Sequence, residues 1–162
     1  MRHRLEVTTP SDREVAISRV FEAPRELVFD CWTVPALLRR WMTGPDGWSF
    51  AVCDVDLRVG GNYRFVWRHV DGRDMGMTGT YREISRPERI VSTELFDMDW
   101  TDGEARSTLV LTEEAGKTTS VNTILYSSRE ARDGAIAIGM VDGIEAGYAR
   151  LDDILAAGVS AK

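Results

Sequence analysis

The sequence predicts an α+β domain in which a curved antiparallel sheet of about seven strands wraps around one long C-terminal helix, in the order β-αα-β6-α. Three observations support this prediction. Apolar and polar residues alternate through most of residues 48–126, and turn residues interrupt the pattern at regular intervals. The stretch after residue 127 has helical periodicity and no proline. One strand-like segment and two short helical segments precede them.

The length of the chain favours one domain. It has 162 residues, enough to bury a core without disulfides or a structural metal. Residues 1–12 are polar and end in Pro-Ser-Asp, so we expect a loose N-terminal leader. A single folded unit is therefore expected over residues 13–158.

The first elements expected after this leader are one strand and two short helices. Residues 14–21 (EVAISRVF) alternate as a strand does. Pro24 opens a short helix, because proline is tolerated in a first helical turn. Thr33 can cap a second helix, which Thr43-Gly44-Pro45 ends.

Six further strands are expected, separated by five turn signals such as Gly60-Gly61 and Asp71-Gly72. Each connection is too short for a parallel crossover, so the sheet must be antiparallel. The expected strands cover approximately 48–57, 62–70, 73–84, 88–98, 104–113 and 117–126.

One long helix is expected from Ser127, which forms a capping box with Glu130, to about Ala157. Each glycine inside it costs about 1 kcal/mol relative to alanine. Such glycines either leave room for a ligand or allow close packing against another element. The apolar arc of this helix contains Ile136, Met140, Ile144, Tyr148, Leu151 and Leu155, and the glycines beside it are Gly139, Gly143 and Gly147.

Composition excludes several classes of function. The net charge of −6 and the lack of a basic stripe argue against a nucleic-acid partner. No apolar run is long enough to insert into a membrane and no secretory signal is present, so we expect a cytoplasmic protein. Two cysteines without ligand-like spacing and two histidines give no support for a metal site, and no motif implies a cofactor.

Aromatic and methionine side chains are expected on one face of two neighbouring strands. They can line a cavity, but filling a solid core is the commoner fate of such side chains. A shift of register by one residue would exchange each strand residue for its neighbour. The candidate ligand-binding residues are Tyr63, Phe65, Trp67, Met77, Tyr81, Phe96, Ile136, Met140, Gly143, Ile144 and Tyr148.

Glu94 is the candidate for a catalytic residue. It alternates with Phe96, which places a carboxylate among apolar groups. It can pair with Arg58 or Arg64 as part of the structure, or serve as a polar anchor or acid/base group in a pocket. Spacing does not decide between these roles, and no recognisable catalytic motif is present.

The stretch from residue 21 to 96 carries four motifs: FEAPRELVFDCWT, PALLRRWMTGPDGW, CDVDLRVGGNYRF and GTYREISRPERIVSTELF. With the final helix, they make the chain resemble the family related to the C-terminal domain of the activator of heat-shock-protein ATPase. That family lies within the START-like and birch-pollen-allergen superfamily (SRPBCC). The resemblance implies a helix-grip fold with a deep cavity between sheet and C-terminal helix. It implies no shared catalytic set.

Three functions are compatible with this prediction. The first is binding or sequestration of a small, largely hydrophobic ligand in the cavity. The second is a cyclase- or hydrolase-like enzyme that uses the same cavity, with Glu94, alone or together with Tyr81 or Tyr148, in proton transfer. The third is a stress-related or co-chaperone-type protein-interaction domain, for which a homodimer is one expected form.

Overall fold

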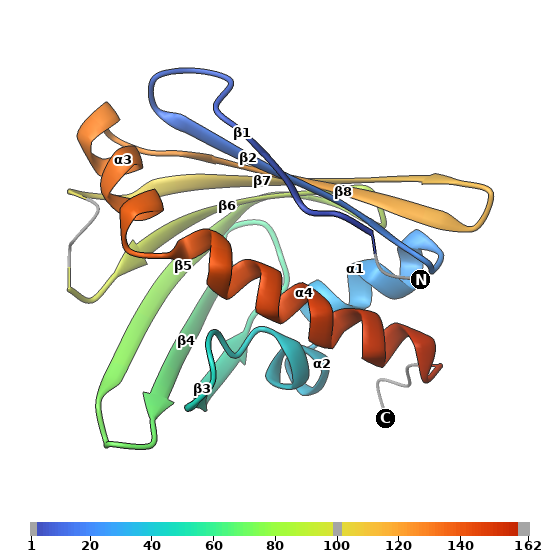
Figure 1. Cartoon of the computed structure of the whole chain (residues 1–162), viewed down its shortest axis with the longest axis horizontal. Coiled ribbons are helices and arrows are strands. Elements are labelled where there is room, and N and C mark those ends of the chain that lie inside the picture. Colours follow the sequence, from blue (N-terminus) through green and yellow to red (C-terminus); the bar gives the residue numbers. More distant parts are fainter. Residues whose placement is uncertain (1–2, 99–101, 159–162) are drawn as a thin grey trace.

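The computed structural model describes residues 3–98 and 102–158, and its centre is one curved antiparallel sheet (Figure 1). The strands lie in the order β1-β2-β8-β7-β6-β5-β4-β3. All four helices lie toward the hollow side of this sheet in Figure 1. The strands are β1 (Glu6–Thr8), β2 (Glu14–Phe21), β3 (Trp48–Val55), β4 (Asn62–His69), β5 (Asp74–Ser85), β6 (Arg89–Phe96), β7 (Ala105–Glu114) and β8 (Lys117–Leu125); the helices are α1 (Arg25–Thr33), α2 (Pro35–Trp41), α3 (Arg129–Ala137) and α4 (Met140–Ala156).

The predicted α+β helix-grip fold is confirmed, with one strand more than expected. The strands β3 to β8 form the expected meander, and β2 pairs with β8 near the β1 edge of the sheet. The additional strand, β1, lies inside the stretch expected to be a loose leader. It pairs with β2 from Glu6 opposite Ser18 to Thr8 opposite Ala16, so this part of the leader has regular structure.

The prediction of one unbroken C-terminal helix is wrong. The helix is divided into α3 and α4 at Gly139, whose φ of 94° lies in the left-handed region that glycine adopts readily. The predicted capping residue is also shifted by one. Ser128 caps α3 by accepting a hydrogen bond from the amide of Ala131, while Ser127 donates its hydroxyl to the carbonyl of Asp102.

The two short helices, α1 and α2, pack against α4. The α4 backbone comes close to α2 and, less extensively, to α1 and α3, whereas no strand approaches it to the same degree. At the closest point Gly147 lies beside α2, where an added Cβ would be 3.1 Å from the carbonyl oxygen of Trp41. Gly147 therefore serves close packing between two helices.

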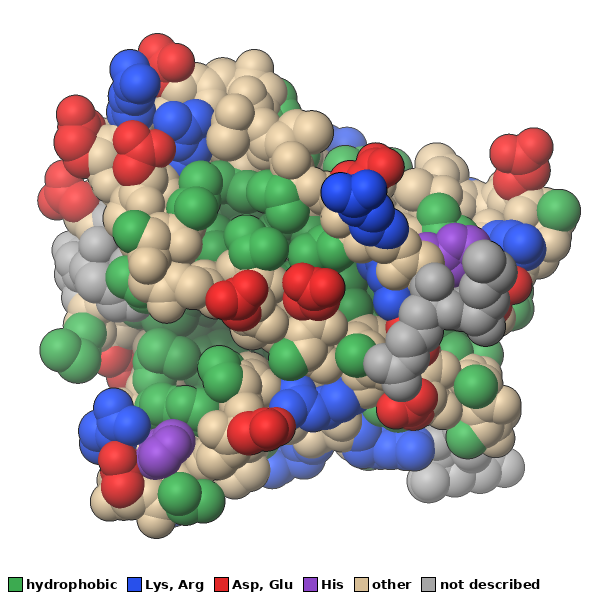
Figure 2. Space-filling model, viewed as in Figure 1, with side chains coloured by type: hydrophobic (Ala, Val, Ile, Leu, Met, Phe, Trp, Pro, Cys, Tyr) green, Lys and Arg blue, Asp and Glu red, His purple; other side chains and the backbone are tan. Residues whose placement is uncertain are grey.

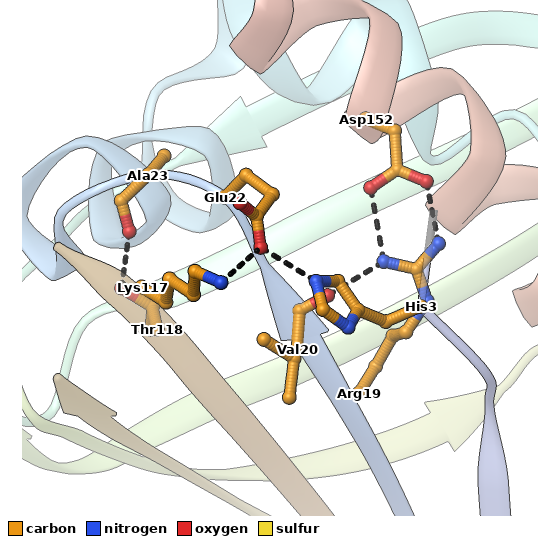
Figure 3. Close-up of polar contacts among 8 residues, drawn as sticks. All are labelled: His3, Arg19, Val20, Glu22, Ala23, Lys117, Thr118 and Asp152. Carbon is orange, nitrogen blue, oxygen red and sulfur yellow. Dashed lines mark hydrogen bonds and ion pairs between the residues drawn. The ribbon is translucent and has the colours of Figure 1, made fainter. Parts of the chain in front are cut away.

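Polar contacts tie α4 to β2 (Figure 3). Arg19 projects from β2 and makes a two-pronged ion pair with Asp152, at 2.9 Å from Nη1 to Oδ1. Both side chains are largely buried, with exposed fractions of 5% and 13%. In the same region Thr118 donates its hydroxyl to the carbonyl of Ala23, and Glu22 contacts both His3 and Lys117. Of these contacts, the ion pair between Arg19 and Asp152 is the one that joins α4 to the sheet.

Candidate functional site: the concave face of the sheet

The concave face of β4 and β5 carries the aromatic and methionine side chains that the sequence places together. Tyr63, Phe65 and Trp67 are buried on β4, while the residues between them are more exposed. Met77 and Tyr81 are buried on β5, and Met77 pairs directly with Phe65. The register used to choose these residues is therefore the one that the strands adopt.

Gly79 makes room for one of these rings. It pairs with Tyr63, and a Cβ at Gly79 would lie 2.2 Å from two carbon atoms of the Tyr63 ring. Because that Cβ is missing, the ring lies across β5 and the Tyr63 hydroxyl donates to the carbonyl of Thr93 on β6. The tyrosine thus bridges three strands.

Glu94 lies on this concave face beside Gly79, in the middle of the sheet. It pairs with Ala105 on β7, while Ser92, two residues before it, pairs with Ser107. These neighbours along and across β6 and β7 on this face are therefore small side chains.

No described residue forms an ion pair or hydrogen bond with the Glu94 carboxylate. The two arginines considered as partners are occupied elsewhere, Arg58 with Asp56 and Arg64 with Asp97. Burial raises the pKa of Glu94 to about 7. A carboxyl group with this pKa can change its protonation state near neutral pH.

Two tyrosines lie within the electrostatic reach of Glu94. Burial, followed by the nearby Glu94 charge, raises the pKa of both Tyr63 and Tyr126. Tyr126, at the end of β8, also donates its hydroxyl to the sulfur of Met140 at 3.6 Å. Sequence reasoning missed Tyr126, although it follows Ile124 at the alternation expected of a strand.

The helix above this area leaves part of it open. Met140 and Ile144 face the core but are only partly buried, as is Phe96 on β6. Figure 2 shows hydrophobic side chains in recessed patches on both sides of α4. The concave face is therefore accessible from two sides of the helix.

The other predicted residues on the helices are not part of this area. Ile136 is 36% exposed on α3. Gly143 faces the loop before β3, with Pro45 Cδ 3.8 Å from the place of an added Cβ. Tyr148 packs in a second aromatic cluster with Phe21 and Trp41, at ring-centre distances of 5.2 and 6.0 Å. The structure thus separates Tyr148 from the rings of β4.

Comparison with known proteins places these features in a family. Residues 22–156 match the family described as Activator of Hsp90 ATPase homolog 1-like protein. The chain belongs to this family. No curated protein matches the chain.

Solved structures of similar proteins have the same fold. A crystal structure of a protein from Rhodobacter sphaeroides is 33% identical, with a TM-score of 0.89, and the match covers 94% of this chain and 98% of that one. A crystal structure from Mycobacterium smegmatis shares the fold at 23% identity, with a TM-score of 0.82 and coverage of 94% and 97%.

Within residues 3–98 and 102–158, no three His, Cys, Asp or Glu side chains lie together as metal ligands would. Cys31 and Cys53 are free and buried, and burial raises the pKa of both thiols, to about 12 and about 11. No helix in the described part is long and apolar enough to cross a membrane.

Proposed function

We propose that this protein binds a small, largely hydrophobic molecule between α4 and the concave face of the sheet, with Glu94 as the polar anchor. The observation that carries this proposal is the unpaired Glu94 carboxylate on the concave face, next to small side chains of β6 and β7, while Met140 and Ile144 of α4 and Phe96 of β6 stay only partly buried. Ligand sites typically combine an apolar lining with few polar groups that orient the ligand. The surrounding rings of Tyr63, Phe65 and Phe96 would supply the apolar contact.

The test uses the neutral fluorescent hydrophobe N-phenyl-1-naphthylamine, titrated into the purified protein. We expect saturable binding that is reduced at least tenfold in an Ile144→Trp variant, because the larger ring would occupy the space beside Ile144. Asp142→Trp, on the exposed side of the same helix, is the matched control and should bind as the parent protein does. Equal binding by all three folded proteins would contradict the proposal. Native mass spectrometry of protein from its own host would identify a retained ligand.

A second function, general acid/base catalysis on the bound molecule, is favoured by one observation. The pKa of Glu94, raised to about 7 by burial, is close to the value that suits a general acid or base at neutral pH. Glu94→Gln separates the two functions once a substrate is known. Loss of turnover with retained binding supports catalysis, whereas loss of binding with no turnover in the parent protein supports the anchor alone.

Cytoplasmic location, a homodimer and a co-chaperone-type interaction stay predictions. Sedimentation analysis of the purified chain tests the homodimer directly. A cavity that binds no hydrophobic probe, together with a stable dimer, would favour the interaction function over ligand binding.

A further inference from the structure

A groove of about 290 Å³ lies on the convex face of the sheet, on the other side from the concave face. It crosses β5, β6 and β7. Its volume is near the lower end of the range for small-molecule sites, which is about 300–1,000 Å³. The groove is lined by Arg82, Glu83, Arg89, Val91, Arg106 and Thr108.

A β-bulge gives this groove two neighbouring side chains from one strand. On β5, Tyr81 pairs with Ser92 and Glu83 pairs with Val91, so Arg82 is an extra residue in the ladder. In a regular strand Arg82 and Glu83 would point to opposite faces. Here both line the convex groove, while Tyr81 stays buried on the concave side.

The floor of the groove is apolar at its centre. Val91 is only 6% exposed although it lies on the solvent side of the sheet. It pairs with Glu83 on one side and with Thr108 on the other. The long stems of neighbouring arginines can cover such a residue while their guanidinium groups remain in solvent.

The charge of the groove is not balanced. Arg89 pairs with Glu83 at 2.9 Å, but Arg82 and Arg106 form no ion pair with any described residue. Other arginines of the convex face do have acidic partners, such as Arg68 with Asp74. Three arginines and one glutamate thus leave an excess positive charge in a chain whose net charge is −6.

We propose that this groove binds a phosphate group through Arg82 and Arg106. Planar guanidinium groups match the oxygens of phosphate and form two hydrogen bonds with it. Thr108, which lines the same groove beside Val91, can donate a hydroxyl hydrogen bond to a third oxygen. The small volume and the negative charge of the rest of the chain favour a small molecule. This site is independent of ligand binding on the concave face.

The test is an NMR titration of the isotopically labelled protein with inorganic phosphate, in which the amide chemical shifts are measured at each step. The ionic strength is kept constant with chloride as the balancing ion. We expect saturable shifts at residues of β5, β6 and β7. Arg82→Gln and Arg106→Gln should each weaken binding at least tenfold. Arg68→Gln removes the same charge from the same face and should leave binding within twofold of the parent protein.

Two results would overturn the proposal. One is a linear response without saturation, and the other is equal weakening by all three substitutions, since both indicate general charge attraction. A parallel titration with phenyl phosphate identifies the source of the group. Tighter binding than inorganic phosphate assigns an organic phosphate whose ring contacts Val91, and weaker binding assigns the free anion.

Discussion

Glu94 shows how one residue can be placed by its sequence and yet have unpredicted chemistry. Alternation with Phe96 correctly put its carboxylate among apolar groups. The absence of a partner for its carboxylate was not predictable. Arg64 instead forms an ion pair with Asp97, and this pairing depends on the strand order, in which β4 and β6 lie on either side of β5. Burial then raises the pKa of Glu94 from 4.5 to about 7, so its ionised form is less favourable in the folded protein than in the unfolded chain.

This pKa predicts a pH-dependent gain in stability for Glu94→Gln. Between pH 4.5 and 7 the folded protein holds a proton on Glu94 that the unfolded chain has lost. The free energy of unfolding attributable to this group therefore falls as pH rises through that range, by at most about 3 kcal/mol. Urea denaturation should show Glu94→Gln close to the parent protein at pH 4 and about 1–3 kcal/mol more stable at pH 8. A pH-independent difference would show that burial does not perturb Glu94.

The C-terminal helices show where element prediction succeeds and fails. Helical periodicity was correct on both sides of Gly139, but the same pattern gave no sign of the break, because Gly139 resembles Gly143 and Gly147 in sequence. Its left-handed conformation depends on how α3 and α4 pack in space. The meander was predictable because its turn residues act locally, whereas β1 forms only by pairing with β2.

Substitution by alanine should change the stability of the protein in opposite directions at two of the glycines in this region. Gly139→Ala forces a Cβ into the left-handed region and should destabilise the protein by about 1–2 kcal/mol. Gly134 lies inside α3 with open space around it, so Gly134→Ala should stabilise by about 0.5–1 kcal/mol. Thermal or urea denaturation of both variants checks this difference. A stabilised Gly139→Ala would mean that an unbroken helix is also accessible to the chain.

At the scale of the whole molecule, the ion pair between Arg19 and Asp152 joins the strand at the beginning of the fold to its final helix. No local pattern predicts it, because the two residues are separated by 133 positions. The candidate site was predictable only in part, because some of its features also depend on contacts between residues far apart in sequence. Strand faces follow from alternation, but the position of α4 depends on contacts with α1 and α2, which are distant in sequence.

Removal of Asp152 should be costly because Arg19 would stay buried without its partner. We expect Asp152→Ala to lower the free energy of unfolding by about 3–5 kcal/mol. Glu145→Ala removes the same charge from an exposed position of α4 and should change it by less than about 0.5 kcal/mol. The double change Arg19→Met with Asp152→Leu should recover most of the loss. Similar effects of Asp152→Ala and Glu145→Ala would show that the buried pair contributes no more to stability than a surface charge does.

The pairing of β2 with β8 also determines the order in which a newly made chain can fold. On the ribosome, β2 is synthesised before all of β3 to β7, and its partner β8 emerges only after them, with Glu14 opposite Leu125. Hairpins of the meander can form before then, since their strands are adjacent in the chain. Until β8 emerges, the edge of β2 that will face it is open to pairing with other chains, so the nascent chain is exposed to misassembly for as long as β3 to β7 are being made.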